Sequence, residues 1–481
     1  MSESATGSTP TAPELRRVMG FWDVLLFNIA TVLGPRWIAS AAHSGQSSIS
    51  LWVIAATLFF VPSALVITEL STRFPAEGGL YVWTKDAFGD FHGFVAGWTY
   101  WIYTFFYFPG LLLASSAMGA YIAGGGAAAL AQNRVFLLSS SLILLAVAVG
   151  LNLVGLNIGK WLQNAGGVAT YVPLLMLVAI AAVLWHAHGS ATHFTLTGLL
   201  PHWNLGTVNL WAQIAFAFTG FELVSAMSGE VRDPRRTFPR AILGSGLLIA
   251  VIYIVGTIAV LALVPAEAVN PQNGVFQAIS LGSTALRYAM VGAIAAAIVT
   301  VGNAGGVGST VAGIARVPFI VGVDHYLPEA FGKIHPKWKT PYVSILVQAA
   351  ISAAILLLIQ IYESANSAYL VLVDAGIILY FIPFVYMYAA VIKLAYRADR
   401  DENSAAILIP GGKIGVWLAG GLGFVVVLVG IALSFIPPGD STNKFASEMK
   451  IIVGTSVSVL VGLALYYRGV RQKRRGQAIS A

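Results

Sequence analysis

The chain has 481 residues, of which 57% are hydrophobic and only 10% are charged, and its mean hydropathy is +0.80. Soluble domains carry about 25% charged residues, so this composition excludes a soluble enzyme and predicts an all-α protein that crosses a membrane several times. The chain has no cysteine, which excludes disulfides and thiolate metal sites. Its 27 Lys and Arg residues exceed its 20 Asp and Glu residues, and basic cytoplasmic loops, which orient membrane proteins, explain this excess.

The N-terminal 18 residues are rich in Ser, Thr and Pro, and they predict a short disordered cytoplasmic tail. Twelve apolar runs follow this tail, and each is long enough to span a bilayer as a helix. The runs cover residues 20–45, 50–70, 92–123, 135–154, 165–186, 207–227, 240–264, 284–318, 342–361, 367–394, 413–437 and 449–468. Residues 469–481 are basic and predict a second cytoplasmic tail.

The distribution of positive charge predicts how these spans are oriented. With the N-terminus in the cytoplasm, 22 of the 27 Lys and Arg residues fall in cytoplasmic segments. Such an excess is typical of the cytoplasmic side of a membrane protein. We therefore expect a multi-pass protein of the plasma membrane, the inner membrane of the cell, with both termini in the cytoplasm.

The first predicted span is interrupted near its middle by Gly34 and Pro35. Proline removes a helix hydrogen bond and glycine tolerates non-helical dihedral angles, so the helix should break here. Backbone groups that are freed inside a membrane must be buried in protein or face a wet cavity. Arg36 follows the break directly and would bring a fixed positive charge to that cavity.

The sixth predicted span has the same organisation as the first. Thr219 and Gly220 lie at its middle, and Glu222 follows two residues later. Charged residues inside a membrane are costly, so Arg36 and Glu222 are candidates for a role in substrate binding or ion coupling. The alternative is that both interruptions are ordinary kinks and that Arg36 and Glu222 form a structural ion pair, which would not prevent the carboxyl group from exchanging protons.

The two interrupted spans occupy corresponding positions in two halves of five helices each. Paired interruptions of this kind indicate an inverted-repeat transporter with its site at the middle of the membrane. The predicted division is residues 19–200 for the first repeat, 201–400 for the second repeat and 401–468 for the last two spans.

Three further acidic residues fall within or near the predicted spans. Asp23 and Glu69 lie near the cytoplasmic ends of the first and second spans, where a helix end or a structural pairing explains them. Asp374 opens the tenth span from the outer side, where we expect a vestibule position that is exposed to water.

Three segments resemble the amino acid–polyamine–organocation transporter family, and they occur in that family's order. Residues 216–242, FAFTGFELVSAMSGEVRDPRRTFPRAI, are similar to the family's sixth-helix break and the cytoplasmic loop after it. Residues 68–98 resemble its link between helices two and three, and residues 315–341 its link between helices eight and nine. The resemblance implies a LeuT-type fold, in which helices one to five and six to ten are inverted repeats and helices one and six are unwound around the substrate.

The resemblance also implies which residues bind the substrate. The two breaks supply most of them, together with an aromatic gate in the sixth helix and the charge that follows the first break. The expected substrate-binding residues are Val32, Leu33, Gly34, Pro35, Arg36, Phe216, Ala217, Phe218, Thr219 and Gly220. This chain has LGPRW where many members have a GSGIF-like run, so its selectivity for the substrate side chain stays open.

Three kinds of coupling are compatible with the residues near the predicted site. The family's proton-responsive glutamate matches Glu222. Other members carry a lysine in the fifth helix in place of a sodium ion, and the corresponding residue here is Thr170. Ser309 and Thr310 in the eighth span resemble the hydroxyl ligands of a sodium site, although the run GNAGGVGSTVAG also favours close helix packing. Proton coupling, sodium coupling and exchange without an ion are therefore all possible.

The expected substrate is an amino acid, because half-helix N-termini suit its carboxylate and freed carbonyl groups suit its ammonium group. Neutral amino acids are slightly favoured, although Arg36 could also serve an acidic side chain. A polyamine would need several carboxylates at the middle of the membrane, and this chain offers Glu222 with Arg36 opposing it. Aromatic residues between 98 and 110 in the third span could add a stacking surface.

Several other motifs are interpreted as structural. The residues His186, His188, His193 and His202 precede the sixth span without a companion carboxylate or cysteine pattern, so a polar loop is expected rather than a metal site. The glycine-rich segments lack the lysine of a phosphate loop. The basic residues 468–476 predict an anchor beside anionic membrane lipid rather than a nucleic-acid site. No cofactor is expected.

Together these features predict a permease that moves amino acids by alternating access, as a proton-coupled symporter or an exchanger, and not an enzyme. The alternatives are a polyamine or organocation transporter and a transport-inactive amino acid receptor of the same fold. A channel would need a continuous polar pore, which the sparse charges argue against. The oligomeric state stays open.

Overall fold

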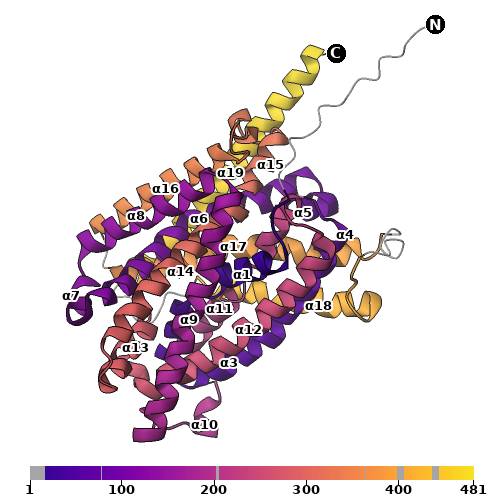
Figure 1. The fold of residues 1–481 in the computed structure, drawn as a ribbon. Coiled ribbons are helices and arrows are strands. Elements are labelled where there is room, and N and C mark those ends of the chain that lie inside the picture. The colour runs from indigo at the N-terminus through magenta and orange to yellow at the C-terminus, as the bar shows by residue number, and fades with distance from the viewer. Residues whose placement is uncertain are drawn as a thin grey trace.

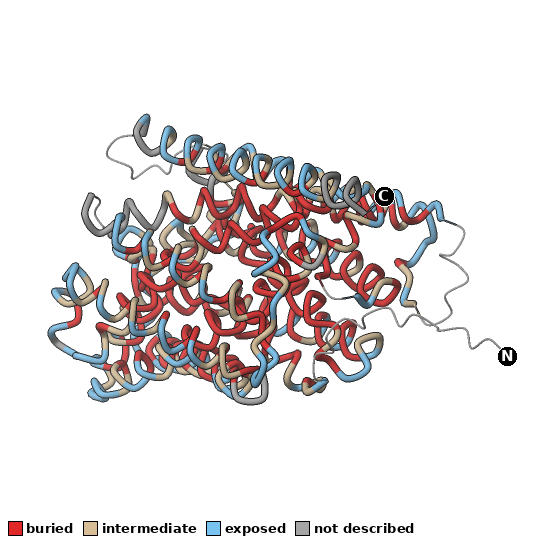
Figure 2. Tube along the Cα trace, turned by 90° about the horizontal axis from the view of Figure 1, so that it is seen from above, coloured by how far each residue is buried: buried red, intermediate tan, exposed pale blue. Residues whose placement is uncertain are grey.

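The computed structural model describes residues 17–76, 78–201, 205–362, 365–397, 406–435 and 444–480. Over these residues the chain is all helical, as predicted, and the helices gather in one bundle (Figure 1). The interior of the bundle is buried along most of its length (Figure 2). Exposed positions concentrate on the outer helices, above all on the C-terminal helix α19 (Lys444–Ser480), which lies along the outside of the bundle (Figure 2).

The helices of the first half follow the predicted spans one to five. The first span is divided into two helices, α1 (Phe21–Val32) and α2 (Pro35–His43). The second span consists of α3 (Ser47–Ala55), the π-helical turn η1 (Ala56–Phe60) and α4 (Val61–Arg73). The next three spans are α6 (Asp90–Gly119), α8 (Arg134–Leu153) and α9 (Leu156–His188). Short helices lie between them: α5 (Leu80–Phe88), η2 (Ala120–Gly126), α7 (Ala127–Leu130) and α10 (Leu196–Leu199).

The second half repeats this plan. The sixth span is divided into α11 (Leu205–Phe216) and the 3-10 helix η3 (Phe221–Glu230). The later long helices are α12 (Pro234–Leu263), α14 (Met290–Ile314) with α15 (Arg316–Val323), α16 (Tyr342–Tyr362), α17 (Ala365–Leu394), α18 (Gly412–Leu433) and α19. The connecting elements are η4 (Ala266–Ala268), α13 (Gly274–Ala285) and η5 (Glu329–Gly332).

Eleven segments of the described chain are long and apolar enough to cross a membrane, which establishes a multi-pass membrane protein. They correspond to all the predicted spans except the ninth. Helix α16 occupies that position, and its described apolar stretch, Tyr342–Leu358, is shorter than the others. The total of twelve spans therefore stays a prediction.

Two of the acidic residues outside the breaks have structural partners, as predicted. The carboxylate of Asp23 accepts hydrogen bonds from the backbone N–H of Gly20 (2.9 Å), at the start of α1, and from the side-chain amide of Asn164 (2.7 Å). Glu69 is fully buried, pairs with Arg73 at 3.3 Å and accepts the backbone N–H of Ile409 at 2.9 Å. Both acids therefore stabilise the fold.

The prediction that Asp374 lies in a water-exposed vestibule is wrong. Asp374 is 1% exposed, and neither oxygen of its carboxylate has a hydrogen-bond partner among the described residues. Helix α17 begins at Ala365, so Asp374 lies more than two helical turns inside it. Helices α6, α11 and α18 pack against α17. Burial by neighbouring helices could not be predicted from a single apolar run.

Glycines allow the helices around the first break to approach closely. A Cβ atom at Gly305 of α14 would lie 2.4 Å from the Cα atom of Gly166 in α9, and one at Gly306 would lie 2.6 Å from the carbonyl oxygen of Ala30 in α1. Both contacts are too short for any residue other than glycine. The glycine-rich run of the eighth span therefore packs helices, and it holds α1 near its break.

Candidate functional site

The first helix is interrupted where the sequence predicts. Helix α1 ends at Val32, Leu33 and Gly34 have extended dihedral angles (φ −70°, ψ 108° and φ −119°, ψ 116°), and α2 begins at Pro35. Proline suits the first position of a helix because the N–H group that it lacks would have no intrahelical acceptor there. The break places the C-terminal end of one half-helix next to the N-terminal end of the other.

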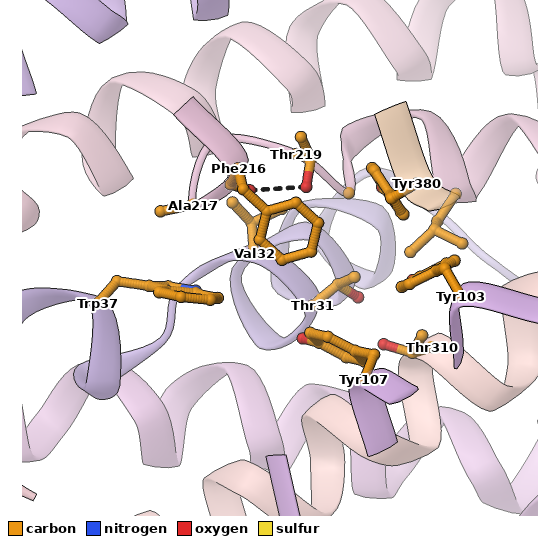
Figure 3. A pocket seen from close by; sticks show the side chains of 12 residues that line it. Thr31, Val32, Trp37, Tyr103, Tyr107, Phe216, Ala217, Thr219, Thr310 and Tyr380 are labelled. Atoms are coloured by element: carbon orange, nitrogen blue, oxygen red, sulfur yellow. Dashed lines mark hydrogen bonds between the residues drawn. The ribbon is translucent and has the colours of Figure 1, made fainter. Parts of the chain in front are cut away.

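The sixth helix is interrupted in a similar way. Gly220 has a φ of +114°, in the left-handed region that favours glycine, and η3 begins directly after it. The hydroxyl of Thr219 donates to the carbonyl oxygen of Phe216 at 2.7 Å (Figure 3). A Cβ atom at Gly220 would lie 3.0 Å from Cγ2 of Val32, so the two breaks are in direct contact.

A single tyrosine joins the two breaks from α12. The hydroxyl oxygen of Tyr253 lies 2.7 Å from the carbonyl oxygen of Val32 and 3.1 Å from that of Ala217, and it accepts the N–H of Gly34 at 3.3 Å. Tyr253 could not be identified from the sequence, because nothing in the apolar seventh span distinguishes this residue from a packing aromatic.

A small cavity lies where the breaks meet (Figure 3). The volume open to the centre of a water molecule is about 20 Å³, which suffices for one or two water molecules. Its twelve lining residues are Thr31, Val32, Trp37, Tyr103, Tyr107, Phe216, Ala217, Thr219, Gly220, Leu223, Thr310 and Tyr380. None of these described lining residues is charged. Any larger ligand requires side chains or half-helices to move.

Half of the predicted substrate-binding residues line this cavity: Val32, Phe216, Ala217, Thr219 and Gly220. Leu33, Gly34 and Pro35 form the first break itself. The ring of Phe218 packs instead against Phe60 and Trp52, with centroid distances of 5.7 Å and 5.6 Å, so its side chain supports the break from behind. The binding roles of these residues stay predictions.

An aromatic layer that includes Arg36 lies beside the cavity, toward its predicted outer side. The ring of Phe216 meets those of Trp37 and Tyr107 at centroid distances of 5.6 Å and 6.3 Å. The guanidinium carbon of Arg36, a residue that is 4% exposed, lies 4.4 Å from the Trp37 ring centroid and 5.2 Å from that of Tyr107. These distances are within the range of cation–π attraction. Arg36 also lines a second narrow space with Phe216 and Leu372, immediately beside the cavity.

Glu222 lies in the first turn of η3, directly after the second break, and is 1% exposed. Its carboxylate accepts hydrogen bonds from the hydroxyl of Tyr100 (2.7 Å), the hydroxyl of Tyr380 and the backbone N–H of Gly220 (3.1 Å). Arg36 is not among the described partners of Glu222, so the ion pair between them that the sequence left possible does not form in this state. The carboxylate is instead tied to the backbone of the break.

The residues considered for sodium coupling lie on α14 and α9. Thr310 lines the cavity and donates to the carbonyl oxygen of Gly306 at 3.0 Å. The hydroxyl of Ser309 is fully buried and has no hydrogen-bond partner among the described residues. Thr170 is 1% exposed and donates to the carbonyl oxygen of Gly166 at 2.8 Å.

Several lining residues were not named by the sequence analysis. Tyr103 and Tyr107 are four residues apart on α6, so they share one helix face, and both belong to the aromatic stretch of the third span. That spacing was a usable signal. Tyr380 of α17 carried none, because its importance comes from its contact with Glu222, 158 residues away.

The predicted cytoplasmic end of the bundle is closed below the second break by a buried ion pair. The guanidinium group of Arg316 donates two hydrogen bonds to the carboxylate of Glu230, at 2.8 Å and 2.9 Å, and both residues are at most 5% exposed. The backbone N–H of Met19, just before α1, donates to the carbonyl oxygen of Glu230 at 3.0 Å. The segment before the first helix and the end of the sixth are thereby held together.

The histidines before the sixth span do not form a described metal site. Within the described chain, no group of three His, Cys, Asp or Glu residues could hold a metal ion. His202 lies outside the described residues, so the interpretation of the full histidine set stays a prediction.

The sequence model of the amino acid permease family matches residues 19–457 of this chain. An uncharacterised transporter of Legionella pneumophila is 28% identical, with 93% of this chain and 96% of that protein covered. The serine/threonine exchanger SteT of Bacillus subtilis is 25% identical, with 96% and 98% covered. The branched-chain amino acid permease BcaP of Bacillus subtilis is 24% identical, with 96% and 94% covered.

Among solved structures, MhsT in complex with L-phenylalanine superposes with a TM-score of 0.65 at 13% sequence identity, and the match covers 87% of this chain and 100% of MhsT. MhsT has a LeuT-type fold, so the match confirms that fold for this chain. The broken first and sixth helices are the feature of the fold that forms the cavity. From its sequence match, its fold and its relatives, the chain belongs to the amino acid permease family of membrane transporters.

Proposed function

We propose that the chain is a secondary active transporter of amino acids that works by alternating access about its two helix breaks. The observation that carries this proposal is that both breaks meet at one small cavity with room for little more than water. A substrate larger than water can enter such a cavity only if the surrounding side chains or half-helices move. Movement of the half-helices at the breaks would then open the cavity to one side at a time.

A zwitterionic amino acid suits the polarity of this cavity. The N-terminal end of α2 and the N-terminal end of η3 carry partial positive charge, which attracts a carboxylate. The C-terminal ends of α1 and α11 carry partial negative charge, which attracts an ammonium group. Because Pro35 has no N–H, the end of α2 offers fewer amide donors than a proline-free break would. Arg36, the next residue, is positioned to supply the missing positive charge.

Neutral amino acids fit the lining better than polyamines do. The described lining consists of aromatic, aliphatic and hydroxyl-bearing residues without a carboxylate, whereas a polyamine needs a negative group for each ammonium group. Glu222 lies behind the break and is occupied by three donors. We expect Arg36→Ala to shift the preference among neutral and acidic amino acids, which competition assays would measure.

Proton coupling through Glu222 is the coupling that the contacts support best. Its carboxylate accepts the N–H of Gly220, the residue whose left-handed conformation forms the second break. Gain of a proton weakens the acceptor for this N–H, so protonation and the conformation of the break would be linked. Sodium binding at Ser309 and Thr310, and exchange without an ion, are the alternatives that the experiment must separate.

We also propose that both termini are cytoplasmic. The basic segments predicted to be cytoplasmic meet at one end of the bundle, where the ammonium group of Lys473 in α19 lies 3.9 Å from the Tyr326 ring centroid and Tyr326 donates to Asp90 at 2.6 Å (Figure 1). The chain has no cysteine, so single introduced cysteines at each terminus can be labelled with a membrane-impermeant thiol reagent. Labelling in inside-out vesicles, and none in intact cells, is the expected result.

The transport test is uptake of radiolabelled amino acids and polyamines into proteoliposomes with an inward proton gradient, an inward sodium gradient or neither. We expect a neutral amino acid to accumulate with the proton gradient. Accumulation only with the sodium gradient would favour sodium coupling through Ser309 and Thr310. Uptake only into vesicles preloaded with substrate would identify an exchanger. Absence of uptake under every condition would contradict the proposed transport activity and favour a transport-inactive receptor.

Glu222→Gln tests the coupling residue, because it keeps the shape and one acceptor oxygen but cannot ionise. We expect this variant to lose its response to the proton gradient while it remains folded. Glu69→Gln is a matched control, since Glu69 is equally buried but pairs with Arg73 and accepts the N–H of Ile409, neither of which belongs to a break. An unchanged dependence on pH in Glu222→Gln would contradict proton coupling through this residue.

A further inference from the structure

We propose that a large polar cavity on the predicted outer side of the bundle is a second binding site for a free amino acid, separate from the helix breaks. This outer cavity lies between the first part of α13 and the chain that links η2 to α8. Helices α7, which belongs to that link, and α13 lie at the end of the bundle away from the C-terminal end of α19 (Figure 1). The existence of the site does not depend on the proposed function, whereas its expected effect on uptake rests on that function.

The two walls of the outer cavity carry polar side chains. Tyr121, Gln132 and Arg134 line it from the η2–α8 link, and Asn273, Gln277 and Ser280 line it from α13 and the residue before it. The volume open to the centre of a water molecule is about 870 Å³, against about 20 Å³ at the breaks. Pockets for small molecules typically measure about 300–1,000 Å³. The outer cavity can therefore hold a small organic ligand without movement of the chain.

The α13 wall is braced by hydrogen bonds within its own loop. The side-chain oxygen of Asn270 accepts the backbone N–H groups of Gln272 (2.9 Å) and Asn273 (3.2 Å). The side-chain amide of Gln277 accepts the N–H of Asn270 at 2.9 Å and donates to the carbonyl oxygen of Ala268 at 2.8 Å. These contacts fix the loop in the conformation that lines the cavity, which is the preorganisation that a binding site needs.

Asn273 carries an acceptor without a donor. The residue is 6% exposed, and its side-chain oxygen Oδ1 has no hydrogen-bond partner among the described residues. Asn273 occupies the N-cap position of α13, but its side chain makes no capping hydrogen bond. A buried acceptor without a donor is unfavourable by about 1–3 kcal/mol, so native structures retain few of them. An ammonium group on a ligand would supply the missing donor.

The opposite wall favours a carboxylate. Arg134 is the first residue of α8, and the N-terminal end of a helix carries partial positive charge. A guanidinium group has five N–H donors, so it can bind a carboxylate while it keeps a contact with the protein. None of the described lining residues is acidic. A carboxylate for Arg134 and an ammonium group for Asn273 together describe an amino acid rather than a simple anion or an amine.

The α13 wall is attached to the half-helix α2. The Nδ1–H of His43, the last residue of α2, donates to the carbonyl oxygen of Val269 at 2.8 Å, and Val269 lines the outer cavity. A Cβ atom at Gly274 of α13 would lie 3.4 Å from Cβ of Ala39 in α2. A ligand that contacts both walls stabilises this arrangement, so it opposes movement of α2 relative to α8. We therefore expect an occupied outer cavity to slow uptake.

The binding test counts the amino acid molecules that the purified full-length protein binds in equilibrium dialysis with radiolabelled L-alanine, L-leucine or L-glutamate. Ala131→Trp places an indole ring in the outer cavity, and Asn273→Leu removes the acceptor Oδ1. We expect both variants to bind one molecule fewer than the parent protein. Asn273→Leu should keep the parental unfolding temperature, because no described group donates to Oδ1. A parent protein that binds none of the three probes, or variants that bind as many molecules as the parent, would overturn the proposal.

The charge of Arg134 is tested by Arg134→Gln. We expect this variant to bind at the outer cavity about tenfold more weakly, as loss of a hydrogen bond to a charged group predicts. Arg287→Gln is the matched control, because Arg287 is an exposed arginine that follows α13 on the predicted outer side but does not line the cavity. Equal losses of affinity in the two variants would contradict a contact with Arg134.

Competition tests the class of ligand. Unlabelled propionate carries only the carboxylate and unlabelled propylamine only the ammonium group, so we expect both to compete less well than unlabelled alanine. Displacement by propionate as effective as that by alanine would identify a general anion site and overturn the assignment to amino acids.

Uptake into proteoliposomes tests the effect on transport. We expect the initial rate of the parent protein to fall at high external substrate, and the rates of Ala131→Trp and Asn273→Leu to reach a plateau. A plateau in the parent protein would overturn the link to α2, and a fall that both variants keep would overturn the role of the outer cavity. If the parent protein transports nothing, the proposed function fails, but the count of bound molecules still decides whether the second site exists.

Discussion

Glu222 and Asp374 are both buried acidic residues in membrane-spanning segments, and each is 1% exposed, but their surroundings are opposite. Glu222 accepts hydrogen bonds from two tyrosine hydroxyls and one backbone N–H. Asp374 has no hydrogen-bond partner for either carboxylate oxygen in the described part of the chain. Burial of a polar group is unfavourable unless hydrogen bonds compensate for the lost water. Hydrogen bonds therefore compensate for the burial of the Glu222 carboxyl group, whereas no described hydrogen bond compensates for the burial of the Asp374 carboxyl group.

The comparison shows that depth in the membrane does not by itself indicate a functional acid. The donors to Glu222 come from α6, α17 and the break of the sixth helix, so three separate elements are arranged around it. No element supplies a described donor to Asp374. The convergence of donors, rather than burial alone, supports a role for Glu222 in coupling.

The largest effect is expected from Glu222→Leu, which removes the acceptor for all three donors. Each buried donor left without an acceptor destabilises the fold by about 1–3 kcal/mol, so we expect a loss of at least about 3 kcal/mol in the free energy of unfolding. Thermal and denaturant unfolding in detergent would measure it. Glu222→Gln keeps an acceptor oxygen and should lose less. Equal losses in the two variants would contradict the role of these hydrogen bonds.

A change of opposite sign is expected from Asp374→Leu. Replacing an unpaired buried carboxyl group by an apolar side chain of similar size removes its desolvation penalty, so we expect a gain of about 1–3 kcal/mol and a higher unfolding temperature. Asp374→Asn keeps a polar group and should gain less. A fall in stability for Asp374→Leu would mean that the carboxyl group has a partner in the membrane, and the contrast with Glu222 would disappear.

The smallest effect is expected from Asp86→Asn, at a carboxyl group outside the spans. Burial raises the pKa of Asp86, while the charges of Arg397 and Lys85 oppose that rise. The folded state therefore holds this proton more tightly than the unfolded chain, and the contribution of Asp86 to stability falls as the pH increases through its pKa. We expect Asp86→Asn to be more stable by less than about 0.5 kcal/mol at neutral pH, with no difference in acid. Unfolding measured across a pH series would detect a reversed sign, which would contradict this direction.

Much of the architecture could be predicted because it depends on local properties of the chain. The apolar runs had the length that a membrane requires, and eleven of them are spans in the described structure. Gly34, Pro35 and Gly220 revealed the breaks because their backbone preferences act within a few residues. Phe216 and Thr219 line the cavity, but they were expected at a substrate site through the family resemblance rather than from local chemistry, and their binding roles stay predictions.

The sequence by itself thus determined the membrane class, the approximate spans and the positions at which two helices break, since hydrophobic length and the dihedral preferences of glycine and proline are local. Only the tertiary structure decided which groups meet at those breaks. Tyr253 and Val32 are 221 residues apart, and Tyr100 and Glu222 are 122 residues apart. The sequence likewise could not distinguish the compensated Glu222 from the uncompensated Asp374, because hydrogen bonding and burial depend on helices that come together only in the folded bundle.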